Sequence, residues 1–72
     1  MAQDIKKIPS SELVQDYFDS KTDIGNCNIA LSQGHTQYSG GSIEGRKRKN
    51  EQFMQLIAAE LDRRGELYRI VT

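Results

Sequence analysis

The amino-acid sequence predicts a mostly all-α fold, a helical hairpin of two or three helices with short terminal strands as an option. Two long segments carry apolar residues at helical spacing. A glycine-rich segment, residues 34–41, separates them. The 72 residues suffice for one domain. We expect an N-terminal arm or short strand at 1–9, the hairpin at 10–66, and an extended tail or strand at 67–72.

The first helix is expected to begin just after Pro9, which ends the short arm or edge strand formed by residues 3–8. Ser10 or Ser11 is a good N-cap, and Glu12 lies in the first turn, where the helix dipole favours a carboxylate. An apolar stripe at helical spacing then follows, made of Leu13, Val14, Tyr17 and Phe18.

Residues 20–28 leave two interpretations open. Ile24, Cys27 and Leu31 continue the helical spacing, which favours one long helix over residues 10–33. Several poor helix formers interrupt this stretch: Ser20, Thr22, Asp23, Gly25, Asn26 and Asn28. Because Thr and Asp are both good N-caps, we favour a second helix that starts at Thr22 or Asp23.

The second main helix is predicted at residues 42–64. Ser42 is its N-cap, Arg64 lies in its last turn, and Gly65 is the expected left-handed residue just beyond it. The residues after Gly65 favour an extended strand. That strand can pair with residues 3–8 or with its own copy in a dimer, or it can be a frayed tail.

The end of this helix is apolar over a wide arc, because seven of nine residues between 53 and 61 are apolar. One neighbouring helix cannot cover such a face, so we expect a homo-oligomer, with a four-helix-like dimer as the simplest form. The expected interface consists of Phe53, Met54, Ile57 and Leu61. In the alternative interpretation, residues 67–71 or the N-terminal arm fold over this face.

A candidate ligand site lies at residues 38–49, where a glycine-rich turn enters the second helix and cations follow at once. Free backbone N–H groups at a helix start attract phosphate, and Tyr38 can stack on a base. The predicted ligand-binding residues are Tyr38, Ser39, Gly40, Gly41, Ser42, Arg46, Lys47 and Lys49. The order of a Walker A loop is absent. The alternative is an ordinary loop followed by a solvated charged turn.

Composition excludes several other classes of site. Ten basic and ten acidic residues give zero net charge, whereas a dedicated duplex-DNA binder usually has a basic excess. The single Cys27 cannot form an internal disulfide and is expected to be a buried thiol, and the single His35 has no partner for a zinc site. Three acidic residues share a rough helical face and are expected to be solvated: Asp16, Asp19 and Asp23. We therefore expect no enzyme activity, no cofactor and no metal.

These features suggest a regulatory binding module for a phosphate-bearing ligand, either a nucleotide or a nucleic acid. One alternative is an adaptor or inhibitor whose apolar helix face docks on a larger protein. Another is a dimeric DNA-binding regulator, either a ribbon-helix-helix with its strand at 3–8 or a helix-turn-helix at 11–20 and 23–33. Because no signal peptide or membrane span is visible, we expect a cytoplasmic protein.

Overall fold

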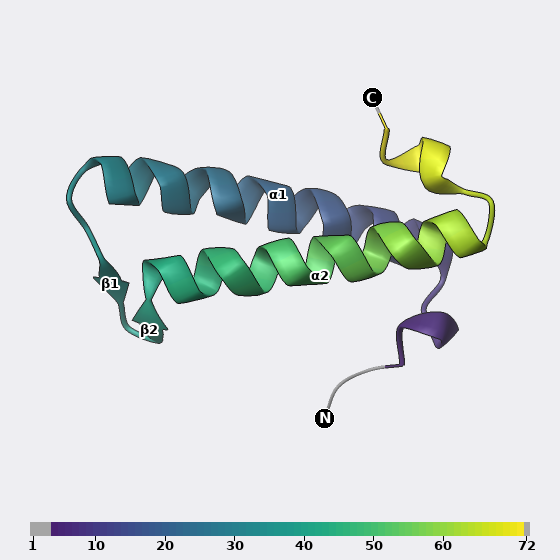
Figure 1. Ribbon diagram of the computed structural model, residues 1–72, viewed down its shortest axis with the longest axis horizontal. Helices are drawn as coiled ribbons and strands as arrows, with labels where there is room; N and C mark the ends of the chain where they lie inside the picture. Colours follow the sequence, from purple (N-terminus) through teal and green to yellow (C-terminus); the bar gives the residue numbers. More distant parts are fainter. Residues whose placement is uncertain (1–3, 72) are drawn as a thin grey trace.

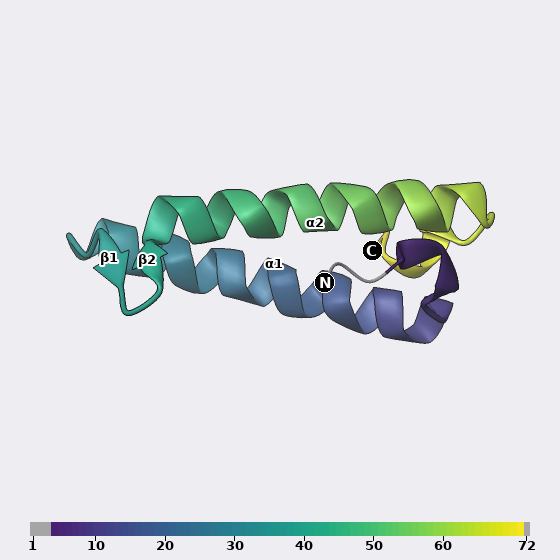
Figure 2. The same ribbon diagram turned by 90° about the horizontal axis from the view of Figure 1, so that it is seen from below.

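Two long helices run side by side in opposite directions and are joined by a short β-hairpin (Figure 1). The computed structural model describes residues 4–71. Its main elements are α1 (Ser10–Ser32), β1 (Gln37–Tyr38), β2 (Gly41–Ser42) and α2 (Ile43–Arg63). Short 3-10 turns at Ile5–Lys7 and Leu67–Arg69 flank them. The expected helical hairpin is confirmed, and Figure 2 shows the helices adjacent along most of their length.

Helix α1 is continuous, so the prediction of a second start at Thr22 or Asp23 was wrong. Its inward face carries on through the polar stretch, because Ser20 and Cys27 are both buried there. The Asp23 side chain binds Arg46 of α2 and does not cap a helix. Tertiary packing thus outweighs the weak local propensities. A helix-turn-helix at 11–20 and 23–33 is incompatible with this continuous helix.

The start of α1 also differs from the prediction, because neither serine acts as its N-cap. Pro9 holds the cap position without a side-chain hydrogen bond. Its carbonyl oxygen accepts hydrogen bonds from the backbone N–H groups of Glu12 and Leu13, each at 3.1 Å. Ser10 is the first helical residue, and its hydroxyl donates to Glu66 at 2.6 Å. A tertiary contact therefore takes the hydroxyl that was expected to cap the helix.

Helix α2 has the predicted ends. The Ser42 hydroxyl oxygen accepts a hydrogen bond from the Gly45 N–H at 3.0 Å, so Ser42 is the N-cap. Beyond the last turn, Gly65 has a φ of +73°, in the left-handed region that favours glycine. Both ends are thus explained by local sequence.

Replacing Ser42 with alanine should remove this cap and lower the free energy of unfolding by about 1 kcal/mol. In a domain of this size, that loss corresponds to a fall in melting temperature of about 4–8 °C. Thermal unfolding followed by circular dichroism measures it. Ser39→Ala, an exposed serine in the adjacent turn, is the matched control and should leave the melting temperature unchanged. Equal shifts in the two variants would show that the cap contributes nothing.

The predicted terminal strands are replaced by the two 3-10 turns within residues 4–71, while residues 1–3 and 72 lie outside the described part. Ile70 is buried, and Leu67 packs against the same cluster. Their i, i+3 spacing places both on one side of a 3-10 turn, so this turn presents an apolar face to the core. Ile5 and Ile8 pack there from the N-terminal side. The alternative interpretation, in which terminal segments fold over α2, is confirmed in this respect.

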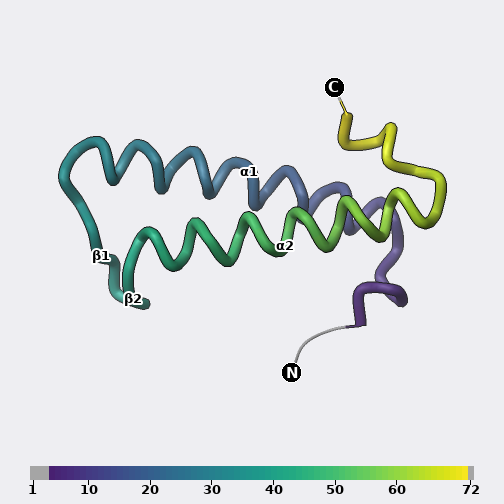
Figure 3. The backbone as a smooth tube through the Cα atoms, in the orientation of Figure 1, coloured from purple at the N-terminus to yellow at the C-terminus, as the bar shows by residue number. Residues whose placement is uncertain are grey.

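The chain trace in Figure 3 shows both terminal segments at the end of the helix pair opposite the β-hairpin. The main core lies at this end. Its buried members are Leu13, Ile57, Leu61 and Ile70. Toward the hairpin end, the buried apolar side chains are those of Cys27 and Ile43. Neither helix within residues 4–71 is long and apolar enough to cross a membrane.

Candidate site at the hairpin end

The segment expected to be an irregular loop contains a tight antiparallel β-hairpin. Gln37 pairs with Ser42, and Tyr38 pairs with Gly41. Gly41 has a φ of +135°, which a residue with a side chain rarely adopts. The backbone N–H of Ile43 donates to the carbonyl oxygen of Thr36 at 3.0 Å. The hairpin is therefore tied directly to the first turn of α2.

The ring of Tyr38 is held in one place by two contacts. The guanidinium of Arg46 lies over the ring, 5.1 Å from its centroid, in a cation–π contact. On the turn side, a Cβ atom added to Gly40 would lie 2.6 Å from a ring carbon, so the ring occupies the space that the glycine leaves. Tyr38 nevertheless remains 40% exposed. The ring thus contacts its own chain on two sides and is still partly exposed to solvent.

Arg46 is engaged within the chain and contributes little free charge. Its Nε and Nη2 atoms donate to the two carboxylate oxygens of Asp23, at 2.7 and 2.5 Å. Asn50 donates to the same carboxylate at 2.5 Å. The hydrogen bonds from Arg46 lower the pKa of the Asp23 carboxyl below its usual value, so the pair stays charged at neutral pH. Arg46 thus joins α1, α2 and the ring of Tyr38.

The other predicted ligand residues differ in their exposure and in their contacts. Ser42 is occupied as the N-cap, so its hydroxyl and the N–H groups of Ile43 and Gly45 already have partners. Lys47 is half-buried and Lys49 is exposed, and neither forms an ion pair with another residue of the described chain. The remaining predicted residues, Ser39, Gly40 and Gly41, are exposed in the turn.

Phe53 lies on the same face of α2 as Arg46 and Lys49. The sequence-based prediction of the ligand site did not include it. Residues 46, 49 and 53 follow the i, i+3, i+7 spacing and therefore share one face of α2. Phe53 is 37% exposed and lies about 10 Å along the helix from Arg46 at the helical rise. We call Tyr38, Arg46, Lys49 and Phe53 the aromatic–basic stripe. The helical period was the available signal, but Phe53 had been assigned to an oligomer interface.

Two of the four residues expected at an oligomer interface are buried inside the chain itself. Ile57 and Leu61 are 0% exposed and belong to the core cluster. The C-terminal turn at Leu67–Arg69 and the N-terminal segment that contains Ile5 and Ile8 cover the face of α2 on which these two residues lie. Phe53 is exposed and Met54 is half-buried. Any partner must therefore contact α2 elsewhere than at Ile57 and Leu61.

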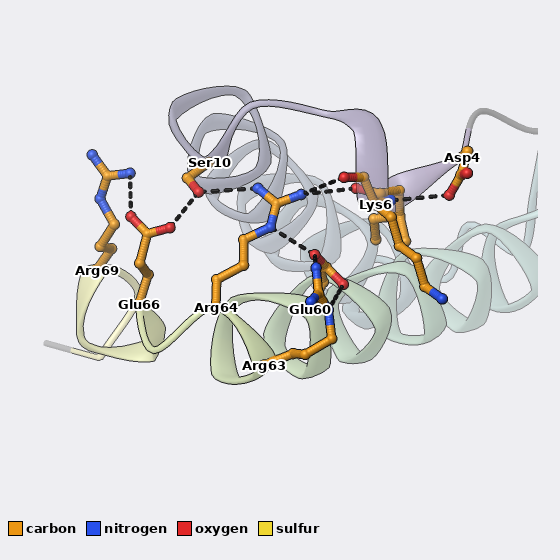
Figure 4. A network of polar contacts seen from close by, with 9 residues as sticks. Asp4, Lys6, Ser10, Glu60, Arg63, Arg64, Glu66 and Arg69 are labelled. Atoms are coloured by element: carbon orange, nitrogen blue, oxygen red, sulfur yellow. Dashed lines mark hydrogen bonds and ion pairs between the residues drawn. The ribbon is translucent and has the colours of Figure 1, made fainter.

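A second polar cluster, at the opposite end of the molecule, is structural (Figure 4). Glu60 is only 5% exposed and accepts hydrogen bonds from Arg63 and Arg64. These bonds, chiefly those from Arg63, lower the pKa of Glu60 to about 2. Arg64 also donates to Ser10 and to the carbonyl oxygen of Ile5, at 3.0 and 3.2 Å. This network ties the N-terminal segment to the end of α2.

The other titratable residues considered in the sequence are Cys27, His35 and the acidic residues of α1. Within residues 4–71, no group of three or more acidic, histidine or cysteine side chains is placed to hold a metal ion. Cys27 is buried, as expected, and His35 is exposed in the loop. Asp19 accepts a hydrogen bond from Gln15 at 3.0 Å.

The fold and site thus define a helix–β-hairpin–helix module with an exposed aromatic and basic edge. No family model, curated protein or solved structure matches this chain.

Proposed function

We propose that the protein is a small non-enzymatic module that binds single-stranded nucleic acid along the aromatic–basic stripe. The observation that carries the proposal is the exposed ring of Tyr38, which contacts Arg46 and Gly40. Lys49 and Phe53 lie on the same face of α2 as Arg46. Proteins that bind single strands combine exposed aromatic rings, on which bases stack, with cations that contact the backbone phosphates.

The spacing of the stripe favours a strand over a single nucleotide. Tyr38 and Phe53 lie at its two ends, and the exposed cation of Lys49 lies between them. Each stacked base contributes about 1–3 kcal/mol, so two rings engage two bases of one strand. Paired bases in a duplex are not available for stacking, and a chain with zero net charge lacks the basic excess of a duplex binder.

Fluorescence anisotropy with labelled single-stranded oligonucleotides of DNA and of RNA tests this proposal. Tyr38→Leu removes the ring and should weaken binding about 10-fold, within the range for one stacked base. Lys49→Ala removes one phosphate contact and should reduce the slope of log affinity against log salt by about 0.7. Circular dichroism of each variant checks that the helices remain folded.

Lys7→Ala is the matched control, because Lys7 is an exposed cation at the opposite end of the molecule and its removal changes the net charge equally. Its affinity should equal that of the parent protein. Tyr38→Phe keeps the ring and should retain most of the affinity. If Tyr38→Leu binds as well as the parent, the stripe is not the site. If a mononucleotide binds as tightly as a strand, the ligand is a nucleotide.

A further inference from the structure

A groove between the helices, lined mainly by apolar side chains, remains open in the single chain. Tyr17 and Ile24 of α1 and Met54 and Ala58 of α2 line it. The polar side chains of Glu51 and Gln55 complete its lining on the α2 side. Residues 51, 54, 55 and 58 occupy a different face of α2 from residues 46, 49 and 53, by the helical period. The groove is therefore distinct from the aromatic–basic stripe.

The groove adjoins the main core at one end, where Tyr17 and Ala58 both line the groove and pack against the buried cluster. The buried cluster centres on Leu13, Ile57 and Leu61, near the terminal segments. Farther along the helix pair, Ile24 and Met54 are only half-buried. A chain of this length obtains little net stability from its own core, and small domains commonly compensate by oligomerisation. Covering the groove would extend the apolar core past the middle of the helix pair.

The charges beside the groove are opposite on the two helices. Lys21 follows Tyr17 by four residues and precedes Ile24 by three, so it lies on the same face of α1 as the groove. The helices are antiparallel and Asp23 contacts Arg46 and Asn50, so Lys21 lies level with the turn of α2 that carries Glu51. Glu51 itself lines the groove. Neither Lys21 nor Glu51 forms an ion pair with another residue between 4 and 71. The α1 side of the groove thus offers a free cation, and the α2 side offers a free carboxylate with Lys47 one helical turn before it.

We propose that a second copy of this chain covers the groove in a two-fold dimer, with α1 of each copy lying over α2 of the other. In this arrangement, Lys21 of each copy faces Glu51 of the other, so the same pair forms twice, as two-fold symmetry requires. In the other two-fold arrangement, α1 lies over α1 of the second copy. The two Lys21 side chains then approach each other, as do the two Glu51 side chains, so this arrangement is disfavoured. Charge complementarity therefore selects both the occupant and its orientation.

Sedimentation equilibrium of the full chain and of charge variants tests this dimer. The parent protein should dimerise. Lys21→Glu and Glu51→Lys should each weaken the dimer by at least about 10-fold, because each replaces two attractive pairs with two repulsive ones. An equimolar mixture of the two variants should form a heterodimer, since Glu at position 21 then faces Lys at position 51, and Lys21 faces Glu51. The double variant should restore the homodimer.

Lys7→Glu provides the matched control, with the same change of charge far from the groove, and should dimerise like the parent. Circular dichroism establishes that each variant is folded, and recovery in the mixture excludes simple misfolding. A monomeric parent protein, a dimer that both reversals leave intact, or a mixture that fails to associate would each overturn the proposal. None of these results depends on nucleic-acid binding, because the exchanged residues lie outside the aromatic–basic stripe.

Discussion

Replacing Leu61 with alanine should lower the free energy of unfolding by about 2–5 kcal/mol, the usual cost of such a truncation in a packed core. Leu61 is 0% exposed and packs in the cluster with Leu13, Ile57 and Ile70. The removed methyl groups lose their burial, and the surrounding helices cannot fully close the cavity. Because a core of this size supplies only about 3–5 kcal/mol of net stability, this loss is comparable to the stability of the whole fold.

Urea denaturation followed by circular dichroism measures this loss. Leu56→Ala is a closely matched control, because it makes the same chemical change on the same helix at a residue that is 60% exposed. Its effect should stay within about 0.5 kcal/mol, as is usual for surface substitutions. Similar destabilisation by the two variants would contradict the position of the core.

Acid should remove the stabilisation that Glu60 provides. Folding lowers the pKa of this carboxyl from 4.5 to about 2, because Arg63 and Arg64 donate hydrogen bonds to its ionised form. A group whose pKa is lowered by folding stabilises the protein fully above its unfolded-state pKa. The contribution is then lost as the pH falls from about 4.5 toward 2. Melting temperature should fall over this interval.

The Glu60→Gln variant isolates this effect from the titration of other carboxyl groups. At neutral pH it should melt below the parent protein, because the charge-assisted hydrogen bonds with Arg63 and Arg64 are weakened. The difference between the two melting temperatures should close as the pH approaches 2. Asp62→Asn, an exposed carboxylate on the same helix, should follow the parent throughout. A Glu60→Gln difference that is constant with pH would show that the carboxylate charge plays no part.

Local sequence sufficed to predict much of the helical hairpin. The Ser42 cap and the left-handed Gly65 are both present, and each depends on residues within one helical turn of the helix end. The apolar stripes of α1 and α2 likewise identify two helices. In the candidate site, the exposed Tyr38 and the cations beside it could be recognised from their order along the chain.

The contacts that organise the site join residues far apart in sequence and could not be predicted in this way. Arg46 was expected to contact a ligand, but Asp23 lies 23 residues earlier and binds it. The Ser10 hydroxyl contacts Glu66, 56 residues away, and so does not cap α1. In each case a charged or hydroxyl group has several possible partners, and only the packing of the two helices determines which one is near.

The sequence by itself determined that this protein is a helical hairpin, where α2 begins and ends, and which turn carries the exposed aromatic ring. These properties follow from propensities and capping interactions that act within a few residues. Tertiary structure alone decided that α1 is unbroken, that Ile70 completes the core and that Ile57 and Leu61 face inward. Those outcomes depend on burial, and burial is a property of neighbouring segments that become adjacent only when the chain folds.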